Sequence, residues 1–422
     1  MFRIIYQLKK EVGIVELIVI GAGASGLLAA AICSSKGVKC QVIEHMPVCG
    51  KKILMTGNGK CNITNLDMSE DKYYCEDKTF IHETLGKVSP KDVIDLFEGF
   101  GMLTRQRDGY VYPNSEQAAA VNNLLLNRCN EYGVEFHCEC EVEEIEKTDA
   151  GYMVHTNQGD FEAENIILAT GGMSYKKTGS DGSGYRLAKE LGHSVNACVP
   201  ALTALICREK YFKDIAGVRI KGIARLYLDK DLIDEQQGEI QFTDYGLSGI
   251  PIFNMSRRVS YLLKKKKHPF VLVDMMPSME KEELHSYIAN IKEKYPKSKV
   301  TDSLSYIVNS KMAVLITKNA GVSYSSKMID INNNQIDAII DQIKEFRGDV
   351  ANIKGFDYCQ VTAGGVSVKE INPENFESKL CDGLYIAGEM IDVDGICGGY
   401  NLHFAFAGAM LAAWDIIKNQ IR

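Results

Sequence analysis

The chain has 422 residues, 45% of them hydrophobic, and a formal net charge of -7. This length allows two or three domains with buried cores, and the acidic balance argues against a general nucleic-acid binder, which needs a basic surface to neutralise phosphates. The basic run from Lys264 to Lys267 is interpreted as a solvated turn. We therefore expect no nucleic-acid partner.

Thirteen cysteines are irregularly spaced without a CxxC pair, and the eight histidines do not cluster with them. This spacing favours reduced thiols in the cytoplasm over a disulfide framework, and it predicts no metal site. The uncharged stretch from Leu17 to Cys33 contains three glycines and is slightly short for a membrane span, which needs about 20 apolar residues. A strand, a glycine turn and a helix explain it better, so we expect a cytoplasmic protein without a membrane partner. Residues 1–13 carry no pattern that indicates a chemical role.

The first chemical signal is a nucleotide-binding pattern near the N-terminus. Ile14 to Ile20 is a short apolar run, typical of a parallel strand buried on both faces. It leads into GAGASG (21–26) and then into a helical segment from Leu27 to Ser35. A second strand, Lys39 to Ile43, ends at an acidic residue. Strand, G-x-G-x-x-G, helix, strand and acid form the dinucleotide fingerprint in its required order.

Each residue of this fingerprint has a physical role. Gly21 allows the tight turn, Gly23 lets the backbone approach a pyrophosphate, and Gly26 lets the helix pack closely so that its N-terminus faces the phosphates. Glu44 follows Gly26 by 18 residues and is expected to accept hydrogen bonds from the adenosine ribose. A carboxylate there disfavours NADP, but this motif leaves both NAD and FAD possible.

Further elements are predicted downstream. Ser89-Pro90 indicates a helix start through side-chain capping and a fixed φ, and Ser115 is expected to cap a helix that runs to about Tyr132. Short alternating strands are predicted at 134–147, 151–156 and 160–164.

Two more apolar strands end in glycine. One leads into Ala169-Thr-Gly-Gly172, and the other, from Gly383, leads into Ala-Gly388-Glu389. After a loop, GGYNL (398–402) opens an apolar helix to about Ile417. The N-terminus of that helix can stabilise negative charge on a reduced flavin. A dehydrogenase that uses NAD alone has no need of this element, so the order of the three strands favours FAD.

On these residues the chain resembles the bacterial FAD-binding flavoproteins known as the aminoacetone oxidase family or as NAD(P)/FAD-dependent oxidoreductases. These are distant relatives of the glutathione-reductase and fumarate-reductase type flavoproteins. The resemblance runs from about residue 16 to the C-terminus. It rests on GAGASG (21–26), GKKILMTGNGKCNITN (50–65), DGYVYPNSEQA (108–118), ATGG (169–172), TGSDGSGYRLA (178–188), FTDYGLSG (242–249), VTAGGVSVKEI (361–371) and GLYIAGEMIDVDGICGGYNLHFAFAGA (383–409).

The resemblance implies an α/β fold in which a Rossmann-like FAD-binding domain, with a parallel sheet and a three-stranded β meander, carries an inserted β-rich domain and a small helical subdomain. The insertion is expected to close over the flavin and form the substrate pocket. The expected boundaries are 14–195 with 356–422 for the FAD domain, 196–255 with 320–355 for the β-rich insertion, and 256–319 for the helical subdomain. Within the inserted region, helical patterns occupy 279–294, 301–317 and 334–346.

The resemblance also implies the cofactor-binding residues. The polar segment 50–65 is expected to run along FAD and to place its glycines and asparagines around the flavin end. Lys60 stands where the family usually has Arg, so a bidentate role at this position does not carry over. The full set of cofactor-binding candidates is Gly21, Gly23, Ala24, Ser25, Gly26, Glu44, His45, Lys52, Gly57, Asn58, Gly59, Lys60, Cys61, Asn62, Val142, Ala169, Thr170, Gly171, Gly172, Gly388, Glu389, Gly399, Asn401 and Leu402.

No side chain stands out as a general acid or base. Tyr400 and His403 are the catalytic candidates, and together with Asp392 they are expected near the flavin edge; His403 stands where Gln is common in the family. A packing histidine on the final helix is the competing interpretation of His403. Cys61 is interpreted as a packed cysteine, because no second cysteine accompanies it at the spacing of a disulfide reductase.

The predicted function is a FAD-dependent oxidoreductase that transfers hydride through flavin N5 between NAD(P)H and a small organic substrate, with unsaturated substrates included. A second strand–GxGxxG–helix unit is absent from the sequence, so NAD(P)H would dock transiently. The alternatives are an oxygen-dependent amine oxidase of the aminoacetone oxidase type, a flavin-containing RNA-modifying or non-catalytic binding protein, and a simple nicotinamide dehydrogenase. The sequence leaves the substrate, the electron donor and the oligomeric state open.

Overall fold

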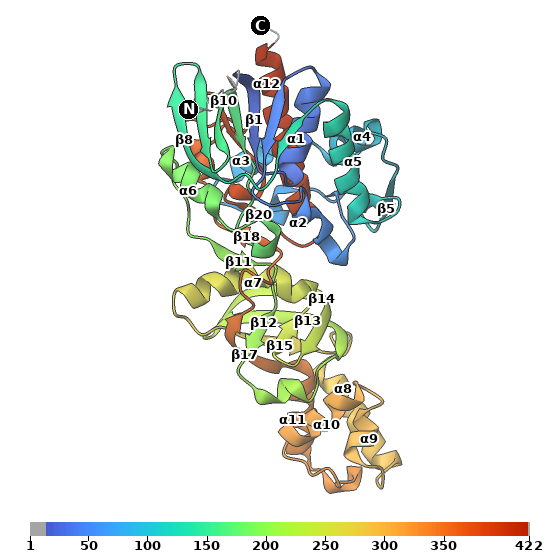
Figure 1. The fold of residues 1–422 in the computed structure, drawn as a ribbon. Coiled ribbons are helices and arrows are strands. Elements are labelled where there is room, and N and C mark those ends of the chain that lie inside the picture. Colours follow the sequence, from blue (N-terminus) through green and yellow to red (C-terminus); the bar gives the residue numbers. More distant parts are fainter. Residues whose placement is uncertain (1–13, 421–422) are drawn as a thin grey trace, which may run out of the picture. The chain divides into compact units, whose positions relative to one another are not determined.

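A twisted sheet with a parallel centre organises the first of two units in this computed structural model, which describes residues 14–420 (Figure 1). The first unit extends to Cys198 and resumes at Val361, and the second unit comprises Val199–Gln360. The sheet order is β7-β2-β1-β10-β9-β8, and β19 also pairs with β10. Its strands are β1 (Val15–Ile20), β2 (Cys40–Ile43), β7 (Glu135–His137), β8 (Val142–Thr148), β9 (Gly151–Thr156), β10 (Gly159–Leu168) and β19 (Leu384–Ile386).

The centre of the sheet is parallel and buried on both faces. β1 pairs in parallel with β2 and β10, and β10 pairs in parallel with β19, so Ile18, Ile166 and Leu384 lie in one row across the sheet. These three side chains are fully buried. Their apolar, largely β-branched composition is what a strand covered on both faces requires. The predicted Rossmann-like fold is confirmed.

Two helices pack against α1 (Ala24–Ser35), namely α5 (Ala118–Glu131) and α12 (Tyr400–Gln420) (Figure 1). α1 carries three consecutive alanines that are completely buried, and α12 is buried over most of its length. The small side chains of α1 allow close approach of a neighbouring helix. Because α12 is buried on all sides from His403 to Ala413, it is apolar all round rather than on one stripe.

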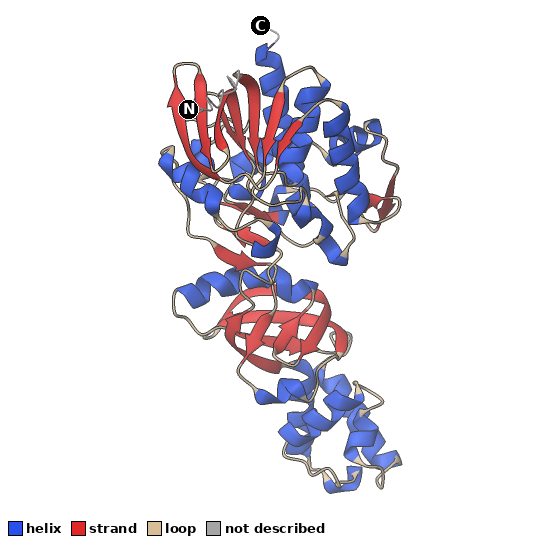
Figure 2. Cartoon of the chain, in the orientation of Figure 1, coloured by secondary structure: helices blue, strands red, loops and turns tan. Residues whose placement is uncertain are grey.

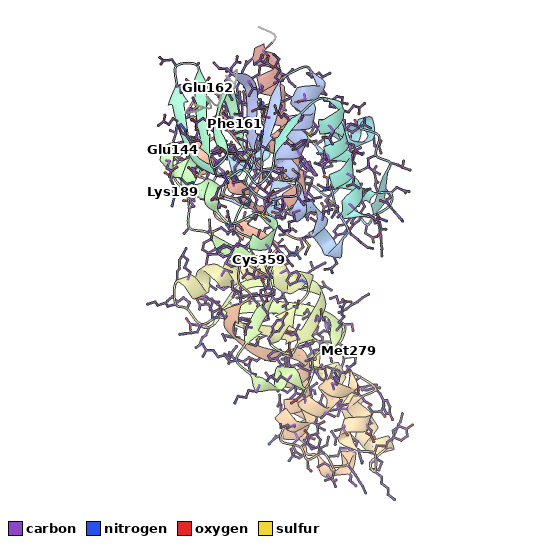
Figure 3. All side chains as sticks on the ribbon, viewed as in Figure 1. Glu144, Phe161, Glu162, Lys189, Met279 and Cys359 are labelled. Atoms are coloured by element: carbon purple, nitrogen blue, oxygen red, sulfur yellow. The ribbon has the colours of Figure 1, made fainter. Side chains whose placement is uncertain are left out.

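The strand boundaries differ from the sequence prediction in two places. The run predicted as one strand at 134–147 is two strands, because the chain turns at Glu139, which has a φ of 55°. β7 then pairs with β2, whereas β8 joins the antiparallel meander at the opposite edge of the sheet. Figure 2 shows the strands of both units in red. Conversely, the segment at 160–164 and the strand before Ala169 form the single strand β10, which pairs with β9 in its first half and with β1 and β19 in its second half. Figure 3 labels Glu144 and Glu162 on this meander.

The other elements of the first unit are short except for α3 and α4. They are α2 (Lys51–Leu54), η1 (Thr56–Asn58), β3 (Thr64–Asn65), η2 (Glu70–Lys72), β4 (Tyr73–Cys75), α3 (Lys78–Lys87), α4 (Pro90–Gly99), β5 (Thr104–Arg107), β6 (Tyr110–Pro113), η3 (Lys176–Thr178), α6 (Ser183–Glu190), β18 (Val361–Ala363), η6 (Val368–Glu370), η7 (Gly388–Met390) and β20 (Val393–Gly395).

One of the two predicted helix caps is present. Ser89 caps α4 through a capping box with Asp92, as predicted. In contrast, α5 begins at Ala118 with Gln117 as its N-cap, so Ser115 lies in the preceding turn and the predicted cap is wrong.

The second unit contains a closed barrel with strand order β12-β15-β14-β13-β16-β17. Phe212, Phe242 and Phe346 pack against one another in its core. The barrel confirms a β-rich region in addition to the Rossmann-like unit. Its elements are β11 (Val199–Ala201), β12 (Leu205–Cys207), η4 (Lys210–Lys213), β13 (Arg219–Leu228), β14 (Asp231–Thr243), β15 (Gly246–Ser248), α7 (Ile250–Lys264), β16 (Phe270–Asp274) and β17 (Phe346–Ile353).

A helical cluster follows the barrel strand β16 and is fastened to it. It consists of α8 (Lys281–Lys294), α9 (Val300–Leu304), α10 (Ser310–Asn319), η5 (Met328–Asp330) and α11 (Asn333–Lys344). The buried ammonium of Lys344 lies 2.8 Å from a carboxylate oxygen of Asp274 and donates to the carbonyls of Met276 and Met279. Figure 3 labels Met279. A buried charge with three acceptors is tolerated where an unpaired charge would be costly.

Two features of this region differ from the sequence prediction. The range 256–319, predicted to be helical, includes the barrel strand β16, and the helix predicted at 301–317 is divided into α9 and α10. Between residues 14 and 420, no helix combines the length and the apolar character needed to cross a membrane.

Candidate functional site

The three glycine-ended strands meet at one edge of the sheet. They are adjacent and parallel in the order β1, β10, β19, so their carboxyl ends lie together. The amide of Ala169 donates to Ile20 (2.8 Å), and the amide of Ala387 donates to Leu168 (3.0 Å). The carboxyl edge of a parallel sheet is where ligands bind in this class of fold. The structure therefore brings together the three segments that the sequence analysis treated as one site.

Steric demands explain two glycines of the first turn but not the third. At Gly21, φ is 103° and an added Cβ would lie 2.5 Å from the carbonyl oxygen of Ala169. At Gly26, an added Cβ would lie 1.9 Å from the carbonyl oxygen of Gly21. At Gly23, φ is -88° and the nearest protein atom would be 4.0 Å away. The protein itself leaves room for a side chain at Gly23, so its glycine fits the close approach of a ligand.

The start of α1 is suited to a phosphate group. Its N-cap is Gly23, which provides no side-chain cap, and its first turn contains no acidic residue. The N-terminal amides of α1 therefore keep their hydrogen-bonding capacity and lie at the positive end of the helix dipole. Ser25 lies in this turn against the third strand end, because a Cβ added at Gly388 would lie 2.3 Å from its hydroxyl oxygen. Ala24 and Ser25 thus lie in the first turn of α1 and stay predicted cofactor-binding residues.

Glu44 lies beside the glycine turn. Its carboxylate accepts from the amides of Ala22 and Met46, each at 2.8 Å. His45 approaches the same carboxylate at 3.9 Å. An acidic side chain held next to the turn by two amides has lone pairs left over, and these are what a ribose hydroxyl would use.

The polar segment 50–65 touches the start of the final helix. The side-chain amide of Asn65 donates to the carbonyl of Gly398 (2.8 Å), and a Cβ added at Gly399 would lie 2.9 Å from the side chain of Asn62. Asn62 also accepts from the amide of Val111 (3.1 Å). More than 300 residues of sequence separate these segments, yet they form one contact surface, as the sequence analysis required.

The tip of this segment is more open than its ends. Gly57, Asn58 and Gly59 are exposed, and Lys60 forms an ion pair with Glu116 at 2.6 Å. Cys61 differs from them, since its side chain is completely buried and burial raises the pKa of its thiol to about 12. A thiol of this kind carries no thiolate at neutral pH. This agrees with the packed cysteine inferred from the sequence.

An ion pair lies across the second and third strand ends. The ammonium of Lys52 is 2.5 Å from a carboxylate oxygen of Glu389 and 2.6 Å from the hydroxyl of Ser174. The other carboxylate oxygen of Glu389 accepts from Ser174 (2.6 Å) and from the amide of Thr362 (2.9 Å). The side chains of Lys52 and Glu389 are only 27% and 19% exposed, so the pair is sheltered yet reachable.

The remaining residues of the second strand end close around this pair. Gly172 has no room for a side chain, because a Cβ would lie 2.5 Å from Thr362 and 2.7 Å from Glu389. The hydroxyl of Thr170 donates to the sulfur of Met390 (3.1 Å). Gly171 likewise leaves only 2.7 Å between an added Cβ and the hydroxyl of Ser180.

His403 is a buried, neutral side chain. Its Nε2 lies 3.1 Å from the carbonyl of Val88, which can only accept, so Nε2 carries the proton and Nδ1 accepts from the hydroxyl of Thr64 at 2.8 Å. Burial lowers the pKa of His403 to about 4. These contacts fit the packing histidine that was the competing interpretation and give no support to a catalytic role.

Tyr400 and Asn401 serve the structure of the helix start. The hydroxyl of Tyr400 donates to the carbonyl of Asp67 (3.1 Å), and burial raises its pKa to about 12. The side chain of Asn401 both accepts from and donates to the backbone of Gly395, each at 2.8 Å. Leu402 is half-buried against the core of the first unit.

Two further candidates make other contacts. Val142 begins the edge strand β8, and its carbonyl accepts from Arg186 (3.3 Å). Asp392 is buried and accepts from the side chain of Asn196 (2.8 Å).

Three site residues were missed in the sequence. Ser174, Thr362 and Asn65 all make site contacts, and each lies within or two residues beyond a segment that carried the family resemblance. Their position in or beside those segments was the only signal that could have indicated them. The identity of a serine, threonine or asparagine does not indicate its hydrogen-bond partner.

The chain is similar to one protein family, to named relatives and to solved structures. The model of the HI0933-like protein Rossmann domain matches residues 15–415. The chain is 36% identical over 396 residues to the 3-dehydro-bile acid delta(4,6)-reductase of Clostridium scindens, with 93% of this chain and 97% of that protein covered. It is 25% identical over 407 residues to the ribosomal RNA dihydrouridine synthase of Escherichia coli, with 95% and 98% covered. Among solved structures, a flavocytochrome c3 fumarate reductase aligns with a TM-score of 0.45 and 13% identity, covering 97% of this chain and 79% of that one.

Proposed function

This chain belongs to the HI0933-like family of FAD-binding Rossmann proteins and is a FAD-dependent oxidoreductase, and we propose that it reduces a carbon–carbon double bond conjugated with a carbonyl group. The observation that carries this proposal is the 36% identity to a delta(4,6)-reductase along 97% of that protein. A double bond at position 4 is conjugated with an oxo group at position 3, and conjugation makes its far carbon a hydride acceptor. Another relative is a dihydrouridine synthase, and dihydrouridine is a uridine with one ring double bond saturated.

The residues present fit FAD. The open space at Gly23 and the uncapped start of α1 would receive the pyrophosphate, and Glu44 would hold the adenosine ribose. Asn62 and Gly399 would face the flavin end. Bound FAD supplies hydride at N5 of its flavin.

The protein's own groups prepare the site for negative charge. The N-terminus of α12 presents a positive dipole, and its first turn contains no acidic side chain that would cancel it. His403 stays neutral between Thr64 and Val88. The ammonium of Lys52 is fixed by Glu389 and Ser174. These groups would bind and orient the flavin. We assign no proton transfer to Tyr400, because its hydroxyl donates to the carbonyl of Asp67.

The electron donor is tested by anaerobic stopped-flow measurement. We propose NAD(P)H, because a reductase needs a donor other than its unsaturated substrate. Mixing the holoprotein with NADH or NADPH should bleach the flavin absorbance at a rate that supports turnover. If neither nicotinamide bleaches it while a small amine does, the protein is an oxidase of the aminoacetone oxidase type instead.

A specific surface supports a second candidate, reduction of a base in RNA. Although the whole chain is acidic, residues 292–327 hold seven lysines against only Glu293 and Asp302. Within the described chain, no carboxylate lies within ion-pair distance of Lys294, Lys297 or Lys299. The segment that holds them runs beside the segment ending in Lys327, with Val300 donating to Ser326 at 3.0 Å.

Exposed aromatic rings accompany these lysines. Tyr295, Tyr306 and Tyr324 are 62%, 79% and 54% exposed, and Tyr324 lines one hollow with Lys311 and Lys318. Lysines that meet phosphates and tyrosines that stack on bases are the ordinary means of holding single-stranded RNA.

The RNA candidate is tested by binding of a ribosomal RNA fragment at several salt concentrations. The double variant Lys297→Glu, Lys299→Glu should lose at least about tenfold in affinity and show a smaller salt slope. Lys230→Glu, an exposed lysine in the turn between β13 and β14, is the matched control and should bind as the wild type does. Equal binding by all three proteins would remove RNA from consideration.

A further inference from the structure

Two cysteine thiols lie in contact next to the nucleotide-binding turn. The sulfur of Cys49 is 3.6 Å from the sulfur of Cys138, and both cysteines are free thiols in the structure. Cys49 is buried, whereas Cys138 is only partly buried. No sequence pattern pairs them, because they are 89 residues apart and neither belongs to a CxxC motif.

The backbones that carry the two cysteines are already tied together on both sides of Glu44. The amide of Glu44 donates to His137 (2.9 Å), and the amide of Cys140 donates to Glu44 (3.0 Å). The amide of Glu139 donates to Met46 (3.3 Å). Since a disulfide has a sulfur–sulfur distance of about 2.05 Å, the sulfurs need to approach by only about 1.5 Å.

The same loop is connected to the glycine turn. The amide of Gly50 donates to the carbonyl of Ala22 (2.7 Å), and the side chain of Asn122 donates to the carbonyl of Cys49 (3.5 Å). Residues 44–50 therefore join the turn that receives the pyrophosphate to the end of β7. A covalent link between Cys49 and Cys138 would limit the movement of this loop at the adenosine end of the FAD site.

We infer that Cys49 and Cys138 form a reversible disulfide that holds the loop after Glu44 closed and slows the release of FAD. The oxidant is a small disulfide such as oxidised glutathione. The Cys138 thiolate attacks one of its sulfurs and releases one thiol, and Cys49 then displaces the second thiol from the mixed disulfide. The protein loses two electrons and two protons, and both appear in the two released glutathione thiols. This role is separate from flavin chemistry and deepens only the cofactor-binding part of the proposed function.

The test exposes the holoprotein to graded ratios of oxidised to reduced glutathione. Differential alkylation followed by peptide mass spectrometry measures the fraction of Cys49 linked to Cys138, and flavin fluorescence after dilution measures the rate of FAD release. We expect the linked form to accumulate with the oxidised ratio and to release FAD at least about fivefold more slowly. The wild type should regain its original rate after reduction with dithiothreitol.

Cys138→Ser is the test variant, and Cys381→Ser is its matched control, because Cys381 is also a partly buried free thiol and its Sγ contacts a backbone carbonyl, that of Leu191. Cys138→Ser should release FAD at one rate under all conditions, whereas Cys381→Ser should behave as the wild type does. The inference is overturned if Cys138 keeps glutathione without linking to Cys49, or if linked and reduced wild type release FAD equally fast. Neither outcome depends on whether the protein reduces any substrate.

Discussion

Gly23 and Gly21 belong to one turn, yet alanine at each position should harm the protein in a different way. At Gly23 the backbone has an ordinary φ of -88°, and the protein atom nearest to the added methyl group would be 4.0 Å away. Gly23→Ala should therefore fold normally, with a cost of at most about 1 kcal/mol for a poorer helix N-cap. The methyl group would stand where the pyrophosphate must approach, so we expect the dissociation constant of FAD to rise at least about tenfold, or about 1.4 kcal/mol.

Gly21→Ala should instead damage folding. A residue with a side chain costs about 1–2 kcal/mol in the left-handed region, and here φ is 103°. The added Cβ would also lie 2.5 Å from the carbonyl oxygen of Ala169, so the backbone of one strand end must shift. We expect the free energy of unfolding to fall by about 2–4 kcal/mol, which corresponds to a fall of roughly 5–10 °C in Tm for a unit of this size.

The assay separates the two effects. Thermal unfolding of the cofactor-free proteins reports stability, and titration with FAD, followed by quenching of flavin fluorescence, reports affinity. Gly86→Ala is the control, because this glycine lies within α3 with nothing within 4 Å of an added Cβ. It should leave FAD binding unchanged. If Gly23→Ala binds FAD as tightly as the wild type, the turn does not contact the pyrophosphate and the reasoning is refuted.

Three further predictions concern single side chains. Burial lowers the pKa of His403 from 6.5 to about 4, so the unfolded chain takes up this proton first as pH falls. The free energy of unfolding should therefore drop by roughly 3 kcal/mol between about pH 6.5 and 4. His403→Gln should flatten that part of a Tm-against-pH curve, and an unchanged slope would contradict the assignment. Cys61→Ser should keep kcat within about threefold, since a thiol with a pKa of about 12 offers no thiolate, and a loss of a hundredfold or more would show a redox role. Lys52→Met leaves the sheltered carboxylate of Glu389 without its cation, so FAD titration should show about tenfold weaker binding, whereas Lys52→Arg should bind more tightly than Lys52→Met.

The parts of the fold predicted from sequence are those set by local patterns. The turn at 21–26 and the strands around it were predicted because the glycines, the apolar runs and the acid are close in sequence and each has a steric or electrostatic cause. Strand pairing was harder to predict. Apolar and polar residues alternate without a break from 134 to 143, and only the turn at Glu139 assigns the two halves of the run at 134–147 to different strands of the sheet.

Close approaches of the backbone can be predicted from the sequence more readily than the partners of side chains. Gly399 was proposed because a helix that opens with glycine allows close approach, and Asn62 is the group that approaches it. His403 needed its neighbours to be understood, since Thr64 and Val88 fix its tautomer and its burial from distant parts of the chain. The ion pair of Lys52 with Glu389 joins residues 337 positions apart, and no local pattern encodes such a contact.

The central claim is that this chain uses bound FAD to saturate a conjugated double bond. The most direct measurement mixes the anaerobic holoprotein, with its flavin chemically reduced, with a conjugated enone and follows the flavin absorbance and the mass of the organic product. The account predicts that oxidised flavin returns and that the enone gains two hydrogen atoms per flavin, while the matching saturated ketone has no effect. It is contradicted if the flavin stays reduced with every enone and is oxidised only when oxygen is admitted.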